Sequence, residues 1–422
     1  MTTDVKMITL GCRLNAYESE VMAGHAREAG LTDAVIINTC AVTNEAVRRG
    51  KQTIRRAVRE NTGSKIIVTG CAAQIEPKTY AGMDGVSHVL GNTEKMVAES
   101  FALKKKSNAK VNVSDIMKAR VADKSRAGGL IERSRAIVQI QNGCDHRCTF
   151  CIIPFGRGNS RSVPAQEVVR RIAMLTEQGF NEVVLTGVDI SSWGDDLPGK
   201  PLLGNLVARI LKSVPALPRL RLSSIDSAEV DDELFDLFAT EQRLTPYLHL
   251  SLQHGDNMIL KRMKRRHSRE DAISLCARLR RVRPDMSFGA DIIAGFPTET
   301  EDMFENSVRL VEECGLAWLH VFPYSARQGT PAAKMPQVNG AVIKDRAKRL
   351  RAAGDTTRTA FLKSRAFGCD LALIEKGNLA RLADFSPVTL PDHNIPPKSM
   401  IGQLRPVRIT GYGAGELLGE LL

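Results

Sequence analysis

The sequence predicts an α/β protein in three parts: an open parallel sheet, then a partial (β/α)6 barrel, then a small antiparallel β-barrel. Short apolar runs alternate with helical segments in the first quarter of the chain, and six more such repeats follow. The C-terminal part instead has only short β-like runs separated by turn residues. A chain of 422 residues that is 43% apolar can bury more than one core.

The first part, residues 1–103, has the pattern of an open parallel sheet. Strands are expected at residues 6–10, 34–38, 65–69 and 88–90, and helices at 18–29 and 45–60, of which the second is strongly basic. Residues 104–134 are basic and poor in aromatic side chains, so we expect a linker that crosses the surface between domains.

The second part, residues 135–355, contains six predicted strands. They lie at residues 136–140, 182–186, 219–223, 248–251, 291–294 and 318–322, each followed by a helical segment. Six such units fit a partial barrel, in which functional residues gather at the carboxyl ends of the strands.

The third part, residues 361–422, is expected to form the small antiparallel barrel. Its predicted strands lie at residues 371–375, 379–383, 387–390 and 405–410. A basic face for nucleic acid could come from Arg381, Lys398, Arg405 and Arg408. A module that only packs against its neighbour fits the composition equally well.

The chain is basic, with a formal charge of +12 and a pI near 9.3. Such a balance attracts polyanions, usually nucleic acid, although a solvated basic surface is the simpler alternative. No run approaches the roughly 20 apolar residues that a membrane helix needs, and the N-terminus lacks a secretory pattern. Nine cysteines without such a signal suit a reducing compartment. We therefore expect a cytoplasmic enzyme with no membrane partner.

Three of the cysteines, Cys144, Cys148 and Cys151, lie within eight residues and are called the loop triplet. Three thiolates can hold three irons of a [4Fe–4S] cluster and leave the fourth iron open, as a catalytic site requires. Phe150 could shield the cluster or pack on a cofactor ring. A zinc knuckle would favour a second Cys-x-x-Cys pair, which the sequence lacks.

Three other cysteines, Cys12, Cys40 and Cys71, each follow one of the first three predicted strands and are called the remote triplet. The carboxyl ends of parallel strands meet at one sheet edge, where ligands bind. Any one of them alone would be interpreted as a buried structural cysteine. Three at equivalent positions instead predict a second cluster.

The segment from Gly143 to Cys151 resembles the signature of the radical S-adenosylmethionine (SAM) enzymes. That resemblance implies that SAM binds the open iron and is cleaved reductively to a 5′-deoxyadenosyl radical. Loop positions that resemble SAM-binding elements of those enzymes are Thr186, Gly187, Ser251, Gln253, Arg262 and Gly295, together with Phe150. The match around Gly295 is partial, because Asp291 stands where the family has glycine.

Taken whole, the chain resembles the methylthiotransferases, which join a cluster-binding N-terminal domain, a radical SAM domain and a C-terminal TRAM domain. The resemblance implies that the remote triplet holds an auxiliary [4Fe–4S] cluster and the loop triplet the SAM-cleaving one. No catalytic residue beyond these cysteines is predicted. The resemblance also implies tRNA as partner and an electron donor such as flavodoxin or ferredoxin, and it leaves the sulfur donor open.

The segment from Gly11 to Ser19 resembles the branch that modifies N6-threonylcarbamoyladenosine (t6A) beside the tRNA anticodon. The threonylcarbamoyl group carries a carboxylate, and a chain with abundant arginine and only 5% aromatic residues suits it. The alternatives are a methylthiotransferase for isopentenyladenosine in tRNA or for a ribosomal-protein aspartate, and a non-catalytic iron–sulfur RNA-binding protein.

Overall fold

The computed structural model describes residues 5–102, 109–120 and 134–422. Most of the linker predicted at residues 104–134 lies outside these ranges. The chain divides into two compact units. The first combines residues 1–129, 139–163 and 325–333, and the second combines residues 130–138, 164–324 and 334–422.

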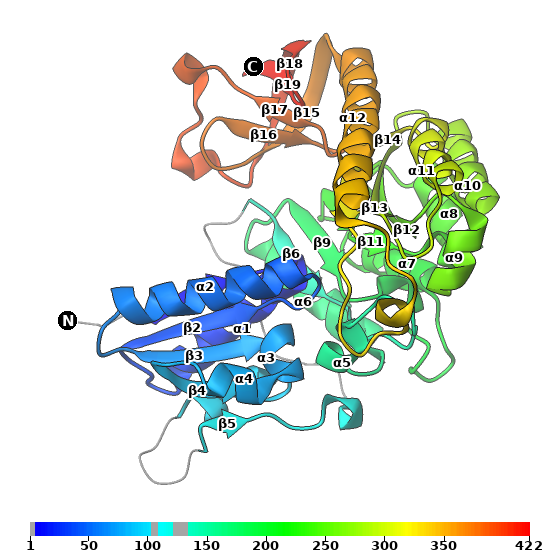
Figure 1. The fold of residues 1–422 in the computed structure, drawn as a ribbon. Helices are drawn as coiled ribbons and strands as arrows, with labels where there is room; N and C mark the ends of the chain where they lie inside the picture. The colour runs from blue at the N-terminus through cyan, green and yellow to red at the C-terminus, as the bar shows by residue number, and fades with distance from the viewer. Residues whose placement is uncertain (1–4, 103–108, 121–133) are drawn as a thin grey trace. The chain divides into compact units, whose positions relative to one another are not determined.

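The first unit is built on a parallel sheet with the strand order β1-β2-β3-β4-β5 (Figure 1). Its strands are β1 (Lys6–Thr9), β2 (Ala34–Thr39), β3 (Lys65–Gly70), β4 (Val86–Leu90) and β5 (Val111–Asn112). Its helices before the loop triplet are α1 (Arg13–Glu28), α2 (Asn44–Glu60), α3 (Cys71–Ile75), α4 (Pro77–Ala81) and the short 3-10 turns η1 (Glu94–Met96), η2 (Ala98–Phe101) and η3 (Ile116–Lys118).

Alternating side chains of β2 explain the two layers around this sheet. Val35 and Ile37 pack into one buried cluster with Ile54 of α2, whereas Ile36 packs into another with Met22 of α1. Successive strand residues point to opposite faces, so a strand buried throughout needs a helix on each side. The four strands predicted here are present, and β5 is an additional short strand within the predicted linker.

The first unit also contains the segment around the loop triplet. That segment comprises β7 (Gln141–Asn142), α5 (Ile153–Arg157) and β8 (Arg161–Ser162), with β7 and β8 paired antiparallel. Ile152, next to Cys151, packs in the same buried cluster as Val35 and Ile54. The loop triplet is therefore anchored in the core of the N-terminal sheet.

The second unit carries the remaining strands of the partial barrel. Its strands are β6 (Ala136–Gln139), β9 (Glu182–Thr186), β10 (Arg219–Leu222), β11 (Ser224–Ile225), β12 (Tyr247–Gln253), β13 (Ser287–Ala294) and β14 (Leu316–Pro323). They form two groups, β10-β9-β6 and β11-β12-β13-β14, and the second group pairs in parallel throughout. The six predicted strands are all present.

Helices follow these strands in turn. They are α6 (Ala165–Glu177), α7 (Leu203–Ser213), α8 (Asp232–Thr240), α9 (Asn257–Met263), α10 (Arg269–Val282), α11 (Glu301–Glu313) and α12 (Gly340–Arg365), with the short 3-10 turns η4 (Ile190–Ser192), η5 (Ser227–Glu229) and η6 (Pro331–Lys334). Within the described residues, none of the helices is long and apolar enough to span a membrane.

The C-terminal segment is a closed barrel in the order β15-β16-β17-β19-β18. Its elements are β15 (Gly368–Ile374), β16 (Leu379–Leu382), β17 (Pro387–Thr389), η7 (Asp392–Asn394), η8 (Lys398–Met400), β18 (Leu404–Tyr412) and β19 (Leu417–Leu421). The pairs are antiparallel as predicted, except that β17 and the unpredicted β19 close the barrel in parallel. Leu362 near the end of α12 is buried in the barrel core.

The fold class predicted from the sequence is confirmed. The predicted domain bounds stay predictions, and α12 runs without a break from residue 340 to residue 365, across the gap placed between residues 355 and 361. The helix and the barrel share a core through Leu362, so they are continuous parts of the second unit.

Candidate metal centre and cofactor site

The remote triplet lies at the carboxyl ends of β1, β2 and β3, as predicted. Cys12 is exposed, whereas Cys40 and Cys71 are buried. Gly11 and Gly70, which precede two of these cysteines, both have a φ of +96°. A Cβ on Gly11 would lie 2.8 Å from the Cβ of Cys40, and one on Gly70 would lie 2.3 Å from the backbone of Thr39. Only glycine permits this conformation and this close approach.

Cys40 lies beside the turn at Gly11 that precedes Cys12, since a Cβ on Gly11 would lie 3.0 Å from Cys40 Sγ. Burial is the main cause that raises the pKa of Cys40 to about 11, and the neighbouring Cys71 and Cys12 act in the same direction. A thiol with such a pKa stays protonated at neutral pH unless a metal displaces the proton.

Arg157, the last residue of α5, reaches across to the remote triplet. Its Nε donates to Cys71 Sγ at 3.0 Å, and its guanidinium also donates to Asn15 Oδ1 and to both oxygens of Glu18. Asn15 in turn donates to the backbone oxygens of Leu10 and Thr39, at 2.6 and 3.1 Å. The arginine thus binds both a cysteine and the residue that ties together the ends of β1 and β2.

A buried ion-pair network surrounds this contact. Lys95 Nζ lies 2.6 Å from Glu18 Oε2, and the side chains of Lys95, Glu18 and Arg157 are at most 2% exposed. Burial raises the pKa of Glu18, but the charges of Arg157 and Lys95 outweigh burial and lower it overall. Burial lowers the pKa of Arg157, but Cys71 and Glu18 outweigh it and raise the pKa well above its usual value.

Two basic side chains, Arg157 and Lys95, face the single carboxylate of Glu18, and burial lowers the pKa of Lys95. A buried charge without a partner costs several kcal/mol. The thiolates of a cluster bound at the remote triplet would supply further negative charge. The residues present therefore fit an iron–sulfur cluster at this position.

The loop triplet is a local structure. Its thiols are partly exposed, and its turns are closed by bonds from Cys144 N to Gly158 O and from Cys151 N to Cys148 O, both 3.0 Å. Gly143 has a φ of +77°, and a Cβ there would lie 1.9 Å from Asn159 O. The backbone is therefore folded into a tight loop that carries the three cysteines, which suits a cluster with one open iron.

Helix α5 joins the two triplets. It begins two residues after Cys151 and ends at Arg157, which bonds to Cys71. Gly156 packs so closely that a Cβ there would lie 3.2 Å from Cys71 Cβ. Asn92, just after β4, donates through Nδ2 to the backbone oxygen of Gly156. Both triplets thus belong to one compact unit and share a short rigid connection.

Five of the six predicted SAM-binding residues of the second unit lie at strand ends or in the loops that follow, and Arg262 lies in α9. Thr186 ends β9 and Gly187 follows it, while Ser251 and Gln253 lie at the end of β12. Gly295 follows β13 with a φ of +78°, and a Cβ there would lie 2.5 Å from Ile343 of α12. Their role in binding SAM stays a prediction, as does that of the half-buried Phe150 in the first unit.

Arg262 of α9 is turned toward the loop after Gly295. It donates to Thr298 Oγ1 at 2.8 Å and Thr298 O at 3.3 Å. The buried Glu299 accepts from the backbone N–H of Phe296 at 2.8 Å and so fixes the same loop. The structure therefore brings Arg262 and the Gly295 loop together.

The sequence reasoning missed Arg157, Glu18, Lys95 and Glu299. A signal for Glu18 existed, because it shares the inner face of α1 with Asn15 and Met22 and is therefore a polar residue on an apolar side. The contacts of Arg157 and Lys95 join positions 86 and 77 residues apart, and local patterns do not reveal them.

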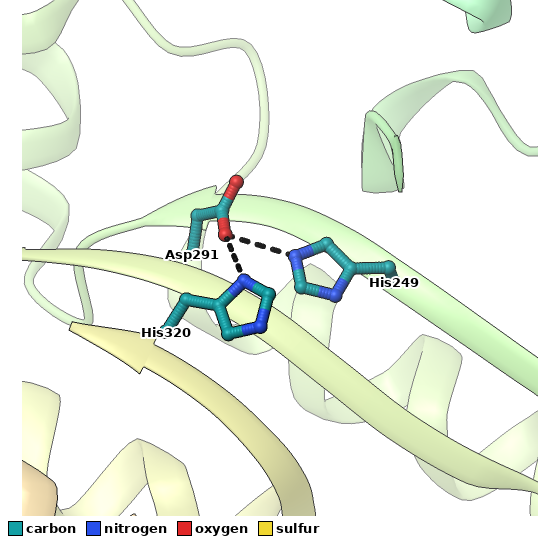
Figure 2. Close-up of side chains that lie close together, drawn as sticks. All are labelled: His249, Asp291 and His320. Carbon is teal, nitrogen blue, oxygen red and sulfur yellow. Dashed lines mark hydrogen bonds and ion pairs between the residues drawn. The ribbon is translucent and has the colours of Figure 1, made fainter. Parts of the chain in front are cut away.

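A second polar cluster lies on neighbouring strands of the second unit. Asp291 Oδ1 lies 2.9 Å from His249 Nε2 and 3.1 Å from His320 Nδ1 (Figure 2). Burial raises the pKa of Asp291, but the hydrogen bonds from His249 and His320 outweigh it and lower the pKa well below its usual value. No pattern in the sequence indicated this cluster.

Two protein-family models match the chain. The model described as "Radical SAM superfamily" matches residues 138–311, which include the loop triplet. The model described as "Uncharacterized protein family UPF0004" matches residues 4–91, which include the remote triplet. The fold and the cysteine loop thus define a radical SAM enzyme.

Its family follows from full-length relatives. The chain is 48% identical over 410 residues to a Rickettsia prowazekii protein named threonylcarbamoyladenosine tRNA methylthiotransferase MtaB, covering 97% of this chain and 96% of the relative. A Bacillus subtilis protein of the same name is 37% identical, and the alignment covers 82% of this chain and 79% of the relative. An Erythrobacter litoralis protein named tRNA-2-methylthio-N(6)-dimethylallyladenosine synthase is 34% identical, covering 84% and 82%.

The chain therefore belongs to the radical SAM methylthiotransferases, enzymes that transfer sulfur-containing groups. The cofactors of this family are SAM and two [4Fe–4S] clusters. The fold agrees with solved radical SAM structures. The methyltransferase TsrM from Kitasatospora setae aligns with a TM-score of 0.55 at 17% identity, over 78% of this chain and 75% of that one.

Proposed function

We propose that this protein adds a methylthio group to carbon 2 of t6A next to the anticodon of tRNA. The observation that carries the proposal is the pairing of two cysteine triplets in one compact unit, joined by α5 and the Arg157–Cys71 contact. The 48% identity over nearly the whole chain to a protein named for this activity supports the choice of base.

The chemistry requires two reactive centres close to each other. Carbon 2 of adenine carries an unactivated hydrogen that acids and bases at neutral pH do not remove usefully. When bound, SAM and the clusters supply hydrogen abstraction and the methylthio group, while the protein supplies position and exclusion of water. The loop triplet would hold the SAM-cleaving cluster and the remote triplet the auxiliary cluster.

The residues around the remote triplet have definite tasks in this proposal. Arg157 balances the negative charge of the sulfur ligands and fixes α5 against Cys71. Glu18 holds the guanidinium in place, and Lys95 bonds in turn to Glu18. Because this network is buried, it also keeps water away from one side of the site.

A basic groove beside Cys40 supports RNA as the substrate. It has a volume of about 770 Å³ and lies between the end of β1 and one face of α2. It is lined by Thr9, Leu10, Gly11, Cys40, Ala46, Arg49, Gln52, Thr53, Arg56 and Arg59. Three arginines along one helix match the charge of a phosphate backbone. A target base must leave the stack to be modified, at a cost of a few kcal/mol.

The second unit would bind SAM through Thr186, Gly187, Ser251, Gln253, Arg262 and Gly295, with Phe150 beside the loop triplet. An electron donor such as flavodoxin or ferredoxin would reduce the clusters, and the cytoplasm is the compartment that provides both this donor and tRNA.

The test offers reconstituted, reduced protein two tRNAs, one bearing t6A and one bearing isopentenyladenosine, and reads the nucleosides by mass. We expect a mass gain for a methylthio group on t6A and little change on the other. Preferential modification of isopentenyladenosine would overturn the substrate while leaving the reaction class intact. Formation of 5′-deoxyadenosine from SAM separates an enzyme from an iron–sulfur protein that only binds RNA.

A further inference from the structure

We propose that His320, held by Asp291, binds the carboxylate of the threonylcarbamoyl group and so selects t6A over bases with an apolar substituent. This inference rests on the proposed function and names the specificity-determining residue for that substrate. It is carried by the cluster of His249, Asp291 and His320 on β12, β13 and β14 (Figure 2).

The cluster lies on the strand face opposite the leucine core. Along β12, Leu248, Leu250 and Leu252 are completely buried, while His249 and Ser251 alternate with them on the opposite face. A Cβ on Gly289 of β13 would lie 2.7 Å from His249 Nδ1, which confirms that the two positions share that face. Ser251, a predicted SAM contact, therefore lies one step closer than His249 to the carboxyl end of the same strand.

Two side chains hold the ring of His249 in place. His249 Nδ1 lies 3.0 Å from the hydroxyl of Tyr247, and its Nε2 faces Asp291. The Tyr247 ring stacks on Phe385 of the C-terminal barrel with centroids 4.5 Å apart. Trp318 meets the same Phe385 ring edge-on at 6.1 Å. The Tyr247 ring that bonds to His249 is thus packed against Phe385, which also contacts Trp318.

His320 is the exposed member of the cluster. The side chain of His249 is 8% exposed and that of Asp291 27%, whereas that of His320 is 62% exposed. His320 Nδ1 faces Asp291, and no described residue bonds to its Nε2. Asp291 Oδ2 points away from both rings (Figure 2). The cluster therefore presents one imidazole nitrogen and one carboxylate oxygen to a ligand.

These two groups match the chemistry of the threonylcarbamoyl substituent. When both ring nitrogens of His320 carry protons, the substrate carboxylate can accept from Nε2–H while Nδ1–H donates to Asp291. The substituent's hydroxyl and urea N–H groups are donors that can reach Asp291 Oδ2. An isopentenyl group offers neither and would leave both protein groups dehydrated and unpaired. Sites built to hydrogen-bond a substrate reject analogues that lack the partner by large factors.

The test compares two forms of the same tRNA, one with t6A and one in which the t6A carboxylate is a methyl ester. The ester removes the charge and keeps nearly the same size. We expect the wild-type enzyme to prefer the acid by about tenfold or more in kcat/KM, the range of one charge-assisted hydrogen bond. In His320→Gln this preference should fall to about twofold or less, with the loss expressed mainly as a higher KM for the acid.

The ratio of acid to ester is measured within each variant, so a partly unfolded or cluster-poor preparation does not alter it. His393→Gln, which changes an exposed histidine in the turn η7, is the matched control and should keep the wild-type ratio. A wild-type ratio retained in His320→Gln would overturn the proposal.

A bound cation is the competing way for this cluster to recognise a carboxylate. The ligand atoms of His249, Asp291 and His320 lie within 4.8 Å of one another and could hold a divalent cation. If a chelator removes the acid preference while the cluster absorbance persists, a cation recognises the carboxylate and direct contact with His320 is wrong. We expect the preference to survive the chelator.

Failure of the proposed function gives a different result from failure of this inference. If the wild-type enzyme modifies isopentenyladenosine and not t6A, the proposed substrate is wrong. If the wild-type enzyme modifies t6A and His320→Gln keeps the full acid preference, the substrate stands and only the role of His320 is wrong.

Discussion

The two cysteine triplets each supply three thiols, but one comes from a single short loop and the other from the ends of three separate strands. The loop triplet is local: three cysteines within eight residues, partly exposed, in a turn that its own backbone closes. The remote triplet is assembled by the sheet from positions as far apart as residues 12 and 71, and is surrounded by buried charge. A local site depends on its own residues, whereas an assembled site also depends on every residue that holds its parts together.

The largest expected effect separates the two triplets by reaction. Replacing Cys144, Cys148 and Cys151 together with Ala should abolish 5′-deoxyadenosine formation, because no cluster remains to bind and reduce SAM. The same change at the remote triplet should leave SAM cleavage measurable and stop methylthiolation. Equal loss of SAM cleavage in both variants would contradict separate roles.

The next prediction tests the buried charge beside the remote triplet. Arg157→Gln removes the cation that bonds to Cys71 and Glu18, and we expect a loss of about 3–5 kcal/mol in the free energy of unfolding. We also expect loss of iron from the remote triplet. Arg48→Gln is the matched control, because this exposed arginine of α2 lies in the same unit, away from both triplets in the sequence, and pairs with Glu45 at 2.7 Å. Urea unfolding and iron content that are equal in the two variants would argue against the network.

Glu182 can be compared with the buried network around Arg157, because it is a buried carboxylate of the second unit, outside the unit that carries both cysteine triplets. It lies 2.8 Å from Arg221 and 3.2 Å from Arg135. Burial raises its pKa, but Arg221 and Arg135 outweigh burial and lower the pKa to about 2 from the ordinary 4.5. A lowered pKa stabilises the fold above the ordinary value, and this contribution is lost as pH falls from about 4.5 toward 2.

Glu182→Gln should therefore destabilise the protein at neutral pH by about 3 kcal/mol, since the buried Arg221 loses its carboxylate partner and the partly exposed Arg135 keeps only Glu375. The difference from wild type should shrink as pH falls below about 4. Iron content in this variant should match wild type, in contrast to Arg157→Gln. Denaturant unfolding at several pH values checks the first expectation, and loss of iron would show that the two networks are not independent.

The smallest expected effect concerns the groove along α2. Replacing Arg49, Arg56 and Arg59 with Gln should weaken tRNA binding at low salt and reduce the slope of log affinity against log salt by about 2–3, close to 0.7–0.9 per lost phosphate contact. Arg55→Gln, on the same helix and outside the groove, is the control for general charge. An unchanged slope in the triple variant would show that RNA does not bind at this surface.

The sequence predicts the strands well because apolar runs of four to eight residues are a strong signal, and both cysteine triplets follow from spacing and strand ends. It misses β19, which closes the barrel in parallel, and the two-residue strands β5, β7, β8 and β11. The helix after Cys12 begins at Arg13 rather than at residue 18, because the turn at Gly11 leads directly into it.

The surroundings of the sites were harder to predict than the cysteines themselves. Arg157 meets Cys71 across 86 residues, and Lys95 meets Glu18 across 77. The cluster of His249, Asp291 and His320 depends on the registry of three strands, in which Asp291 lies directly opposite His320. Contacts of this kind depend on how strands pair and helices pack, so a local pattern in one sequence does not predict them.

Two separate clusters are central to the proposed reaction, and iron content per chain measures them most directly. Reconstituted wild-type protein should hold about eight iron atoms, and each of the two triple cysteine variants should hold about four, as two [4Fe–4S] clusters require. Mössbauer spectra should show cubane clusters in both variants. A remote-triplet variant that keeps all the iron of wild type would contradict the auxiliary cluster and, with it, the proposed reaction.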